Sequence, residues 1–294
     1  MDNKLPAYTI FTDATADLND TMMDELPCVE IIPMEVEFGT DTYTFGPGGN
    51  ITVDQFYAMQ RAGKYASTSQ INPMTYMDCF ERTLQEGKDI LYLCFSTGLS
   101  NTIQNAKYSA ELLKQDYPDR QIAIVDTLCA SVGEGFLVRE AARKQAEGLT
   151  MDELAEWVIA HRLEVCHWFT VDTFDHLRHG GRVSAASAAI GNVLSIKPLL
   201  HVDEQGCLQV TKKPRGQKQA LRELLAHLEA GLNPDLEKTI LIAHGDNPEG
   251  AAALTVEIQS SFPDAAIIQG TIGPVIGAHT GPGMLAVIYW GKNR

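Results

Sequence analysis

Short apolar runs alternate with helical patterns through the first half of the chain. Runs of four to eight mostly apolar residues predict strands, and apolar positions spaced by three or four residues predict helices. The expected strands are 8–12, 31–38, 90–95 and 122–125, and the expected helices are 74–87, 102–113, 133–147 and 150–161. Because a helix-length segment follows each of the last two strands, we expect parallel pairing and an α/β fold.

Strand patterns continue through the second half, with a boundary near residue 160. The expected strands are 165–171, 196–202, 208–211, 239–243, 266–268 and 285–289, and a helix is expected at 185–194. We therefore divide the chain into domains at 1–160 and 161–294. Since no low-complexity linker marks the boundary, the two domains should pack closely.

Charge restricts the possible partners. The 294 residues carry a net charge of −15, which opposes binding to nucleic acid or to anionic lipid because both are held mainly by lysine and arginine. Residues 1–160 hold 11 basic and 25 acidic side chains, whereas residues 161–294 hold 12 and 13. The two halves should present different surfaces to a partner.

Composition also bears on location and metal binding. The longest apolar run, 284–290, is too short to span a membrane, and the start of the chain lacks the basic and apolar regions of a signal peptide. We expect a cytoplasmic protein without stable membrane insertion. The six cysteines form no Cys-x-x-Cys pair, so we expect reduced thiols and no metal site.

Two hydroxyl-rich loops, 67–70 and 96–102, are the strongest functional signal. The second lies between a strand and a helix, where free backbone N–H groups and the helix dipole favour a small anion such as a carboxylate or phosphate. Gly98 should permit an unusual backbone turn that leaves the Ser100 hydroxyl facing a ligand. Taken alone, residues 67–70 are better explained as the cap of helix 74–87 than as a ligand site.

Two further glycine-rich segments each carry one ionisable side chain of interest. Segment 273–283 surrounds His279, and its simplest interpretation is a turn between strands with the imidazole bonded to a backbone carbonyl. Its spacing matches neither the P-loop nor the dinucleotide fingerprint. In segment 179–184, two glycines precede Arg182, which could bond carbonyl groups or an acid.

One basic cluster stands out from the acidic background. It comprises Lys212, Lys213, Arg215, Lys218 and Arg222. A solvated strand and helix face explains it more simply than a docking patch for an acidic partner.

These segments, in this order, resemble the DegV family of bacterial fatty-acid-binding proteins, some of which are the lipid-carrying subunit of fatty acid kinase. The resemblance rests on Phe-Thr-Asp-Ala-Thr-Ala-Asp-Leu at 11–18, Thr-Ser-Gln at 68–70, the loop at 95–102, His-Gly-Gly-Arg at 179–182 and Ile-Gly-Ala-His-Thr-Gly-Pro-Gly at 276–283. It implies a mostly parallel first sheet flanked by helices and a second α/β domain with a mixed sheet. The chain departs from the family pattern at Ala14, Thr97 and Asn101.

The resemblance also implies a ligand and a site. Thr68 and Ser100 would bond the carboxylate of a long-chain fatty acid such as palmitate or stearate, and Ser69, Ser96 and His279 would support that end. The acyl chain would run between the domains. The implied role is a non-catalytic carrier without a further cofactor, which presents the carboxylate to a separate kinase for acyl-phosphate formation, with Arg182 at the docking surface.

Two other functions are weighed against this one. In an esterase-like hydrolase, Ser100 would be the nucleophile and His279 the base, oriented by Asp13 or Asp172. The loop lacks the second glycine of Gly-x-Ser-x-Gly, which disfavours this alternative. A transcription regulator is opposed by the acidic charge and by the lack of a helix-turn-helix pattern.

Overall fold

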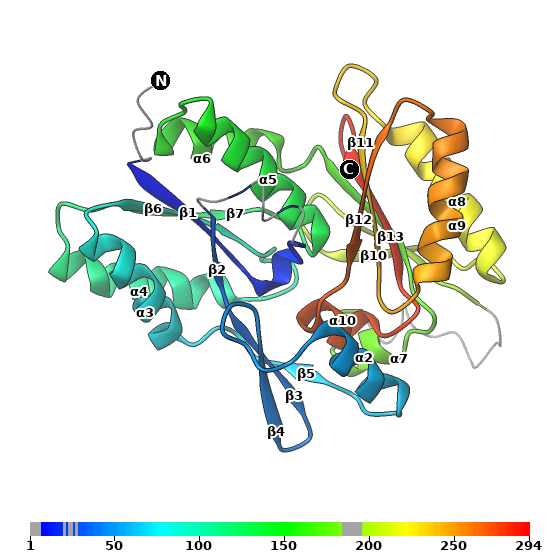
Figure 1. Ribbon diagram of the computed structural model, residues 1–294, viewed down its shortest axis with the longest axis horizontal. Helices are drawn as coiled ribbons and strands as arrows, with labels where there is room; N and C mark the ends of the chain where they lie inside the picture. Colours follow the sequence, from blue (N-terminus) through cyan, green and yellow to red (C-terminus); the bar gives the residue numbers. More distant parts are fainter. Residues whose placement is uncertain (1–6, 20–21, 23–25, 27–28, 184–195) are drawn as a thin grey trace.

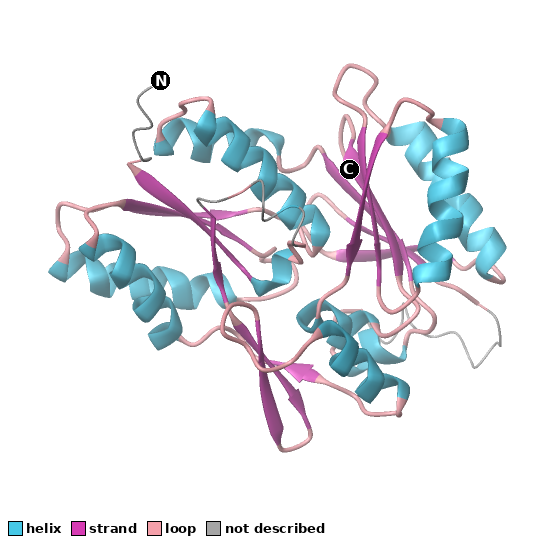
Figure 2. Ribbon diagram, viewed as in Figure 1, coloured by secondary structure: helices cyan, strands magenta, loops and turns pink. Residues whose placement is uncertain are grey.

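The computed structural model describes residues 7–19, 22, 26, 29–183 and 196–294. Its strands form two large sheets and one small sheet, and helices cover the outer faces (Figures 1 and 2). The α/β fold, with a parallel first sheet and a mixed second sheet, confirms the sequence prediction. The helix expected at 185–194 lies outside the described residues.

The first large sheet is parallel and has its helices on both faces. Its strands, in spatial order, are β2 (Val29–Ile32), β1 (Tyr8–Asp13), β6 (Asp89–Cys94) and β7 (Ile122–Asp126). Helices α3 (Pro73–Gln85) and α4 (Thr102–Asp116) cover one face, and α5 (Val132–Ala146) and α6 (Met151–His161) cover the other (Figure 1). Burial on both faces explains the continuous apolar runs.

A small antiparallel sheet corrects the predicted strand at 31–38. Pro33 lacks an N–H group to continue a ladder, and the segment divides there into β2 of the large sheet and β3 (Met34–Phe38) of the small one. Strand β3 pairs with β4 (Asp41–Phe45) and with β5 (Ser67–Thr68), and α2 (Val53–Arg61) lies between these two in sequence. The 3-10 helix η1 (Ala14–Ala16) follows β1.

The second large sheet is mixed. Its spatial order is β10 (Leu208–Lys212), β9 (Leu199–Val202), β8 (Val165–Thr170), β13 (Leu285–Trp290), β11 (Thr239–His244) and β12 (Ala266–Thr271). The pair β11 and β12 is parallel and the other pairs are antiparallel. Helices α8 (Gln217–Gly231) and α9 (Pro248–Ser261) pack on one face.

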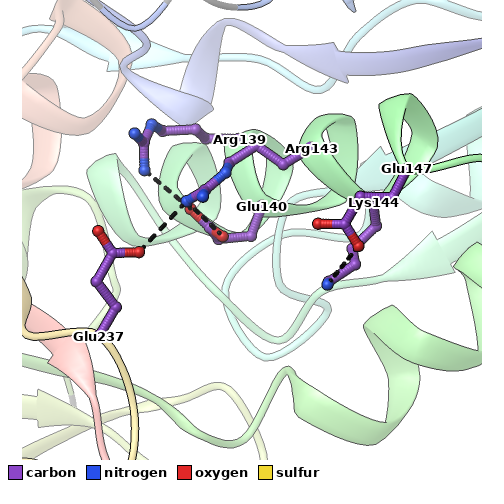
Figure 3. A network of polar contacts seen from close by, with 6 residues as sticks. All are labelled: Arg139, Glu140, Arg143, Lys144, Glu147 and Glu237. Atoms are coloured by element: carbon purple, nitrogen blue, oxygen red, sulfur yellow. Dashed lines mark hydrogen bonds and ion pairs between the residues drawn. The ribbon is translucent and has the colours of Figure 1, made fainter.

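Helix α5 packs between the two large sheets and joins their cores. One apolar cluster contains Phe136 of α5, Leu91 of the first sheet and Leu241 of the second. One ion pair also links α5 to the segment before β11: Arg143, which lies 3.3 Å from Glu140 within α5, is 3.6 Å from Glu237 (Figure 3). Because Arg143 and Glu237 are largely exposed, this bridge adds little, and apolar packing holds the halves together.

Two short helices complete the described fold near the junction of the halves. Helix α7 (Asp175–His179) follows β8, and α10 (Pro274–Thr280) precedes β13. Although α10 comes late in the chain, it packs against α2, α7, β3 and β5. This helix corrects the turn expected within 273–283, because Pro274 is compatible with a first helical turn and the residues that follow are mostly buried.

Among the described residues, no helix is long and apolar enough to cross a bilayer. Nor do His, Cys, Asp and Glu side chains of this part of the chain gather in a group of three that could hold a metal ion.

Candidate functional site

A cavity of about 340 Å3 lies between the two halves of the molecule. Its polar lining includes Thr68, Gln70, Ser100, Arg182 and His279. Apolar side chains of the second large sheet, of the loop after β6 and of the short helices form most of the remaining wall; they include Phe95, Leu99, Phe169, Leu177, Val202, Leu208, Ile276, Met284, Ala286 and Ile288. The cavity therefore suits an elongated apolar ligand with a polar group.

Ser100 reaches this cavity from the loop between β6 and α4. Its Oγ accepts the backbone N–H of Thr102 at 3.3 Å, at the start of the helix. This bond uses an oxygen lone pair, so the hydroxyl hydrogen can still be donated to a ligand. The neighbouring N-cap residue, Asn101, makes no side-chain capping bond.

Gly98 is needed in this loop for a reason other than the one expected. Its φ angle is not positive. Instead, the turn between β9 and β10 approaches so closely that an added Cβ would lie 2.6 Å from the carbonyl oxygen of Gly206. The prediction of an unusual backbone turn at Gly98 is therefore wrong; the glycine makes room for another segment.

Thr68 and His279 come together from distant parts of the sequence. Thr68 lies on β5 rather than in a helix cap, since Asn72 caps α3. Its Oγ1 is 2.8 Å from Nε2 of His279, which α10 carries. The imidazole thus bonds a side chain. The expected bond from His279 to a backbone carbonyl is not found among the described residues.

Burial keeps the His279 imidazole neutral. Desolvation, with smaller contributions from Arg182, His179 and His176, lowers its pKa to about 3. Nδ1 is buried without a hydrogen-bond partner, and the absence of a side chain at Gly180 makes room for it. If Nε2 carries the proton and donates it to Thr68, the Thr68 hydroxyl hydrogen can be donated to a ligand.

The other expected residues differ in their placement. Ser69 lines the cavity and is exposed. Ser96 is fully buried outside the cavity lining, where its hydroxyl donates to the Gly206 carbonyl at 2.8 Å. Arg182 lines the cavity and donates to the carbonyls of Leu99 and Gly180, so it connects the two loops.

Other polar groups of the cavity wall are already paired with the protein. The Ser131 hydroxyl donates to Asp17, whose pKa burial raises to about 8, and the Thr280 hydroxyl donates to the Ile276 carbonyl. His167 accepts the Ala130 N–H, and burial lowers its pKa well below the usual range. An apolar chain can lie against these groups without leaving them unsatisfied.

The structure does not assemble the triad of an esterase. His279 is bonded to Thr68, and its Nδ1 meets no carboxylate. Asp172 pairs with Lys197, and Asp13 bonds Thr15 and Tyr92 in the core. Among the described residues, no acid therefore orients His279 as a base for Ser100.

Several residues around this cavity were not identified from the sequence. Thr15, Thr102 and Ser131 also line it, from the 3-10 helix η1, the first position of α4 and the residue before α5. Their hydroxyl groups resemble ordinary helix caps in the sequence, and the apolar wall resembles ordinary core. Only the packing of the two halves of the molecule distinguishes these cavity-lining residues from ordinary helix caps and core residues.

Comparisons with known proteins agree with this arrangement. The chain is 39% identical over 287 residues to a DegV domain-containing protein of Clostridium perfringens, with 98% of each chain covered. A DegV family protein from Thermus thermophilus, whose structure concerns fatty acid binding, has a TM-score of 0.84 at 28% identity and covers 98% of this chain and 100% of its own. A fatty acid binding DegV family protein from Streptococcus agalactiae also has a TM-score of 0.84 at 28% identity, with 97% and 99% covered.

The family model described as uncharacterised protein of the DegV family matches residues 7–292, nearly the whole chain. With hydroxyl groups in the wall of a largely apolar cavity between its halves, this chain belongs to the DegV family.

Proposed function

We propose that this protein binds one long-chain fatty acid in the cavity between its halves and holds the carboxylate with Thr68 and Ser100. The observation that carries the proposal is the pair of hydroxyl groups, one on β5 and one before α4, that line an otherwise largely apolar cavity. The Thermus thermophilus and Streptococcus agalactiae relatives, which bind fatty acids, support it.

The acyl chain would supply most of the affinity. Burial of a methylene group contributes about 0.8 kcal/mol, so a sixteen-carbon chain contributes on the order of 10 kcal/mol before ordering costs. A hydrogen bond to the carboxylate contributes about 1.5–3 kcal/mol. The two hydroxyl groups would therefore determine which end of the ligand lies at Thr68 and Ser100, whereas the apolar wall retains the molecule.

We further propose that the bound carboxylate is presented to a separate kinase. Hydroxyl donors neutralise less of the carboxylate charge than a bidentate guanidinium would, so an oxygen stays nucleophilic toward a phosphoryl group. Arg182, the charged side chain beside them, already donates to two backbone carbonyls. Ser69 and the loop that carries Arg182 would border the surface that the kinase approaches.

Lipid extraction followed by mass spectrometry tests the binding. We expect about one long-chain fatty acid per chain, either after purification or after incubation with palmitate. Ser100→Ala should reduce the retained lipid, whereas Ser261→Ala, which removes an exposed hydroxyl bonded to Glu229 on α8, should not. A wild-type protein that holds no fatty acid and gains none would contradict the proposal.

The presentation step has a separate assay. The palmitate-loaded protein, a fatty acid kinase and ATP should yield an acyl phosphate that hydroxylamine traps as the hydroxamate, and omission of either protein should abolish the product. A lipid-loaded protein that gives no product with a kinase active on another DegV family carrier would contradict the presentation step alone.

A further inference from the structure

A continuous chain of buried hydrogen bonds runs from the core to the wall of the cavity. Tyr92 Oη donates to Asp13 Oδ2 at 2.6 Å, and Tyr76 Oη lies 3.0 Å from Tyr92 Oη. Tyr76 Oη also lies 3.0 Å from Thr102 Oγ1, which accepts the Ile71 N–H at 3.2 Å. The chain thus ends at a cavity-lining residue next to the Ser100 loop.

A carboxylate at one end sets the direction of every bond in this chain. An ionised Asp13 only accepts, so Tyr92 donates to it and must accept from Tyr76, because each hydroxyl has one hydrogen. Tyr76 then accepts from Thr102. The Thr102 hydroxyl hydrogen consequently points away from the cavity, and its oxygen is left for the Ile71 N–H.

Glu134 is a second buried carboxyl group near Asp13, and its contact with Thr15 shows that one of the two carboxyl groups is protonated. Thr15 Oγ1 is within hydrogen-bond distance of both Asp13 Oδ1 and Glu134 Oε2, yet it has a single hydrogen to donate. One of the two carboxyl groups must therefore carry a proton and donate to Thr15. Asp13 and Glu134 are both fully buried.

The surroundings assign that proton to Glu134. Asp13 receives bonds from the Thr15 backbone and hydroxyl, the Tyr92 hydroxyl and the Phe95 backbone, whereas Glu134 receives one from Thr12 besides its contact with Thr15. Burial raises the pKa of Asp13, but the donors stabilise its charged form and oppose part of that effect. Burial and the nearby Asp13 charge raise the pKa of Glu134 well above the usual range.

We propose that Asp13 is a specificity-determining residue of the cavity: its buried charge turns the Thr102 hydroxyl hydrogen toward Tyr76 in the core, so that this hydroxyl does not donate to an anionic head group bound by Ser100 and Thr68. The proposal rests on the proposed function. The negative charge behind the hydroxyl chain also acts against a bound carboxylate, so Asp13 weakens the hold on the acid group without touching it. A loosely held carboxylate suits a carrier that has to give it up.

Three variants separate these effects. Asp13→Asn removes the charge and lets the chain reverse, because the amide donates to Tyr92 and each hydroxyl then donates toward the cavity. Tyr76→Phe keeps the charge but removes the acceptor of the Thr102 hydrogen, and the ring still packs against Phe80. Glu134→Gln imitates the protonated acid, since its amide donates to Thr15 and its oxygen accepts from Thr12.

The measurement is the affinity for palmitate relative to hexadecanol, which has the same chain length and no charge. We expect Asp13→Asn to raise this ratio about tenfold, as one more hydrogen bond to a charged group would, and Tyr76→Phe to raise it by a smaller factor. Glu134→Gln should leave it within about twofold of wild type. Adding Thr102→Val to Asp13→Asn should remove most of the gain.

Tyr8→Phe is the matched control for the loss of a buried tyrosine hydroxyl, because Tyr8 donates to the Leu149 carbonyl outside this network. It should leave the ratio unchanged. An unchanged or lowered ratio in both Asp13→Asn and Tyr76→Phe, with thermal unfolding still cooperative, would overturn the proposal. A ratio raised by Glu134→Gln but not by Asp13→Asn would mean that Glu134 carries the charge and Asp13 the proton, which contradicts the assignment.

A readout without ligand keeps the two proposals distinguishable. Carboxyl 13C chemical shifts at neutral pH should show an ionised Asp13 and a protonated Glu134 in the wild-type protein. If wild type binds neither palmitate nor hexadecanol but the shifts agree, the proposed function fails and the proton assignment stands. A protonated Asp13 would overturn the inference whatever the protein binds.

Discussion

Thr68→Val is the sharpest test of the pairing between β5 and α10. Valine has nearly the shape of threonine and also favours strands, so the backbone pairing of β5 with β3 should persist. The change removes the hydroxyl that lies 2.8 Å from His279 Nε2. Because Nδ1 is already without a partner, both ring nitrogens would then be unpaired.

Two magnitudes follow from this geometry. An unsatisfied buried donor costs about 1–3 kcal/mol, which should lower the melting temperature of the ligand-free protein by about 2–4 °C for each kcal/mol. Loss of one hydrogen bond to the carboxylate costs about 1.5–3 kcal/mol, so palmitate should bind about 10- to 150-fold more weakly. Hexadecanol, which lacks the charge, should lose less.

Thermal unfolding without ligand and calorimetric titration with palmitate measure the two effects separately. Thr68→Ser keeps the hydroxyl and should recover most of the affinity, which makes it the matched control. Wild-type affinity in Thr68→Val would refute the role of this hydroxyl, and an unchanged melting temperature would refute the stabilising bond to His279.

Three further outcomes are expected. Ser100→Ala should weaken palmitate binding by about 1–3 kcal/mol in a titration, and it should lower the melting temperature of the ligand-free protein only slightly, through the lost bond from the Thr102 N–H. Equal affinity would exclude Ser100 as a head-group donor. Gly98→Ala should destabilise the protein in urea unfolding, because its Cβ would meet the Gly206 carbonyl at 2.6 Å; unchanged stability would mean that the β9–β10 turn yields easily. The His279 pKa of about 3 lies below the value near 6.5 expected in the unfolded chain. Between these two pH values the unfolded state binds more protons than the folded state, so the free energy of unfolding falls as the pH is lowered. His279→Gln should make that fall shallower in unfolding measurements at several pH values, and an identical slope would contradict the buried neutral imidazole.

Strand and helix placement was largely predictable because it depends on local periodicity. The runs at 90–95 and 122–125 correspond closely to β6 and β7, and the helix expected at 150–161 is α6. Such runs record burial on both faces of a strand or on one face of a helix, which a single chain shows without its neighbours. Pro33 carried a visible signal for the break between β2 and β3, but the run around it was read as one strand.

The chemistry of the site was predictable only by residue type. The sequence by itself determined that hydroxyl-rich loops follow apolar segments, and hence that a small anion could bind there. Tertiary structure decided that Thr68 meets His279 across 211 positions and that the Ser96 hydroxyl is used on the Gly206 carbonyl. It also decided that the series of hydrogen bonds starting at Asp13 ends at Thr102. These pairings depend on how the sheets and helices pack, and the periodicity of one segment contains no information about the distant segment that it will contact.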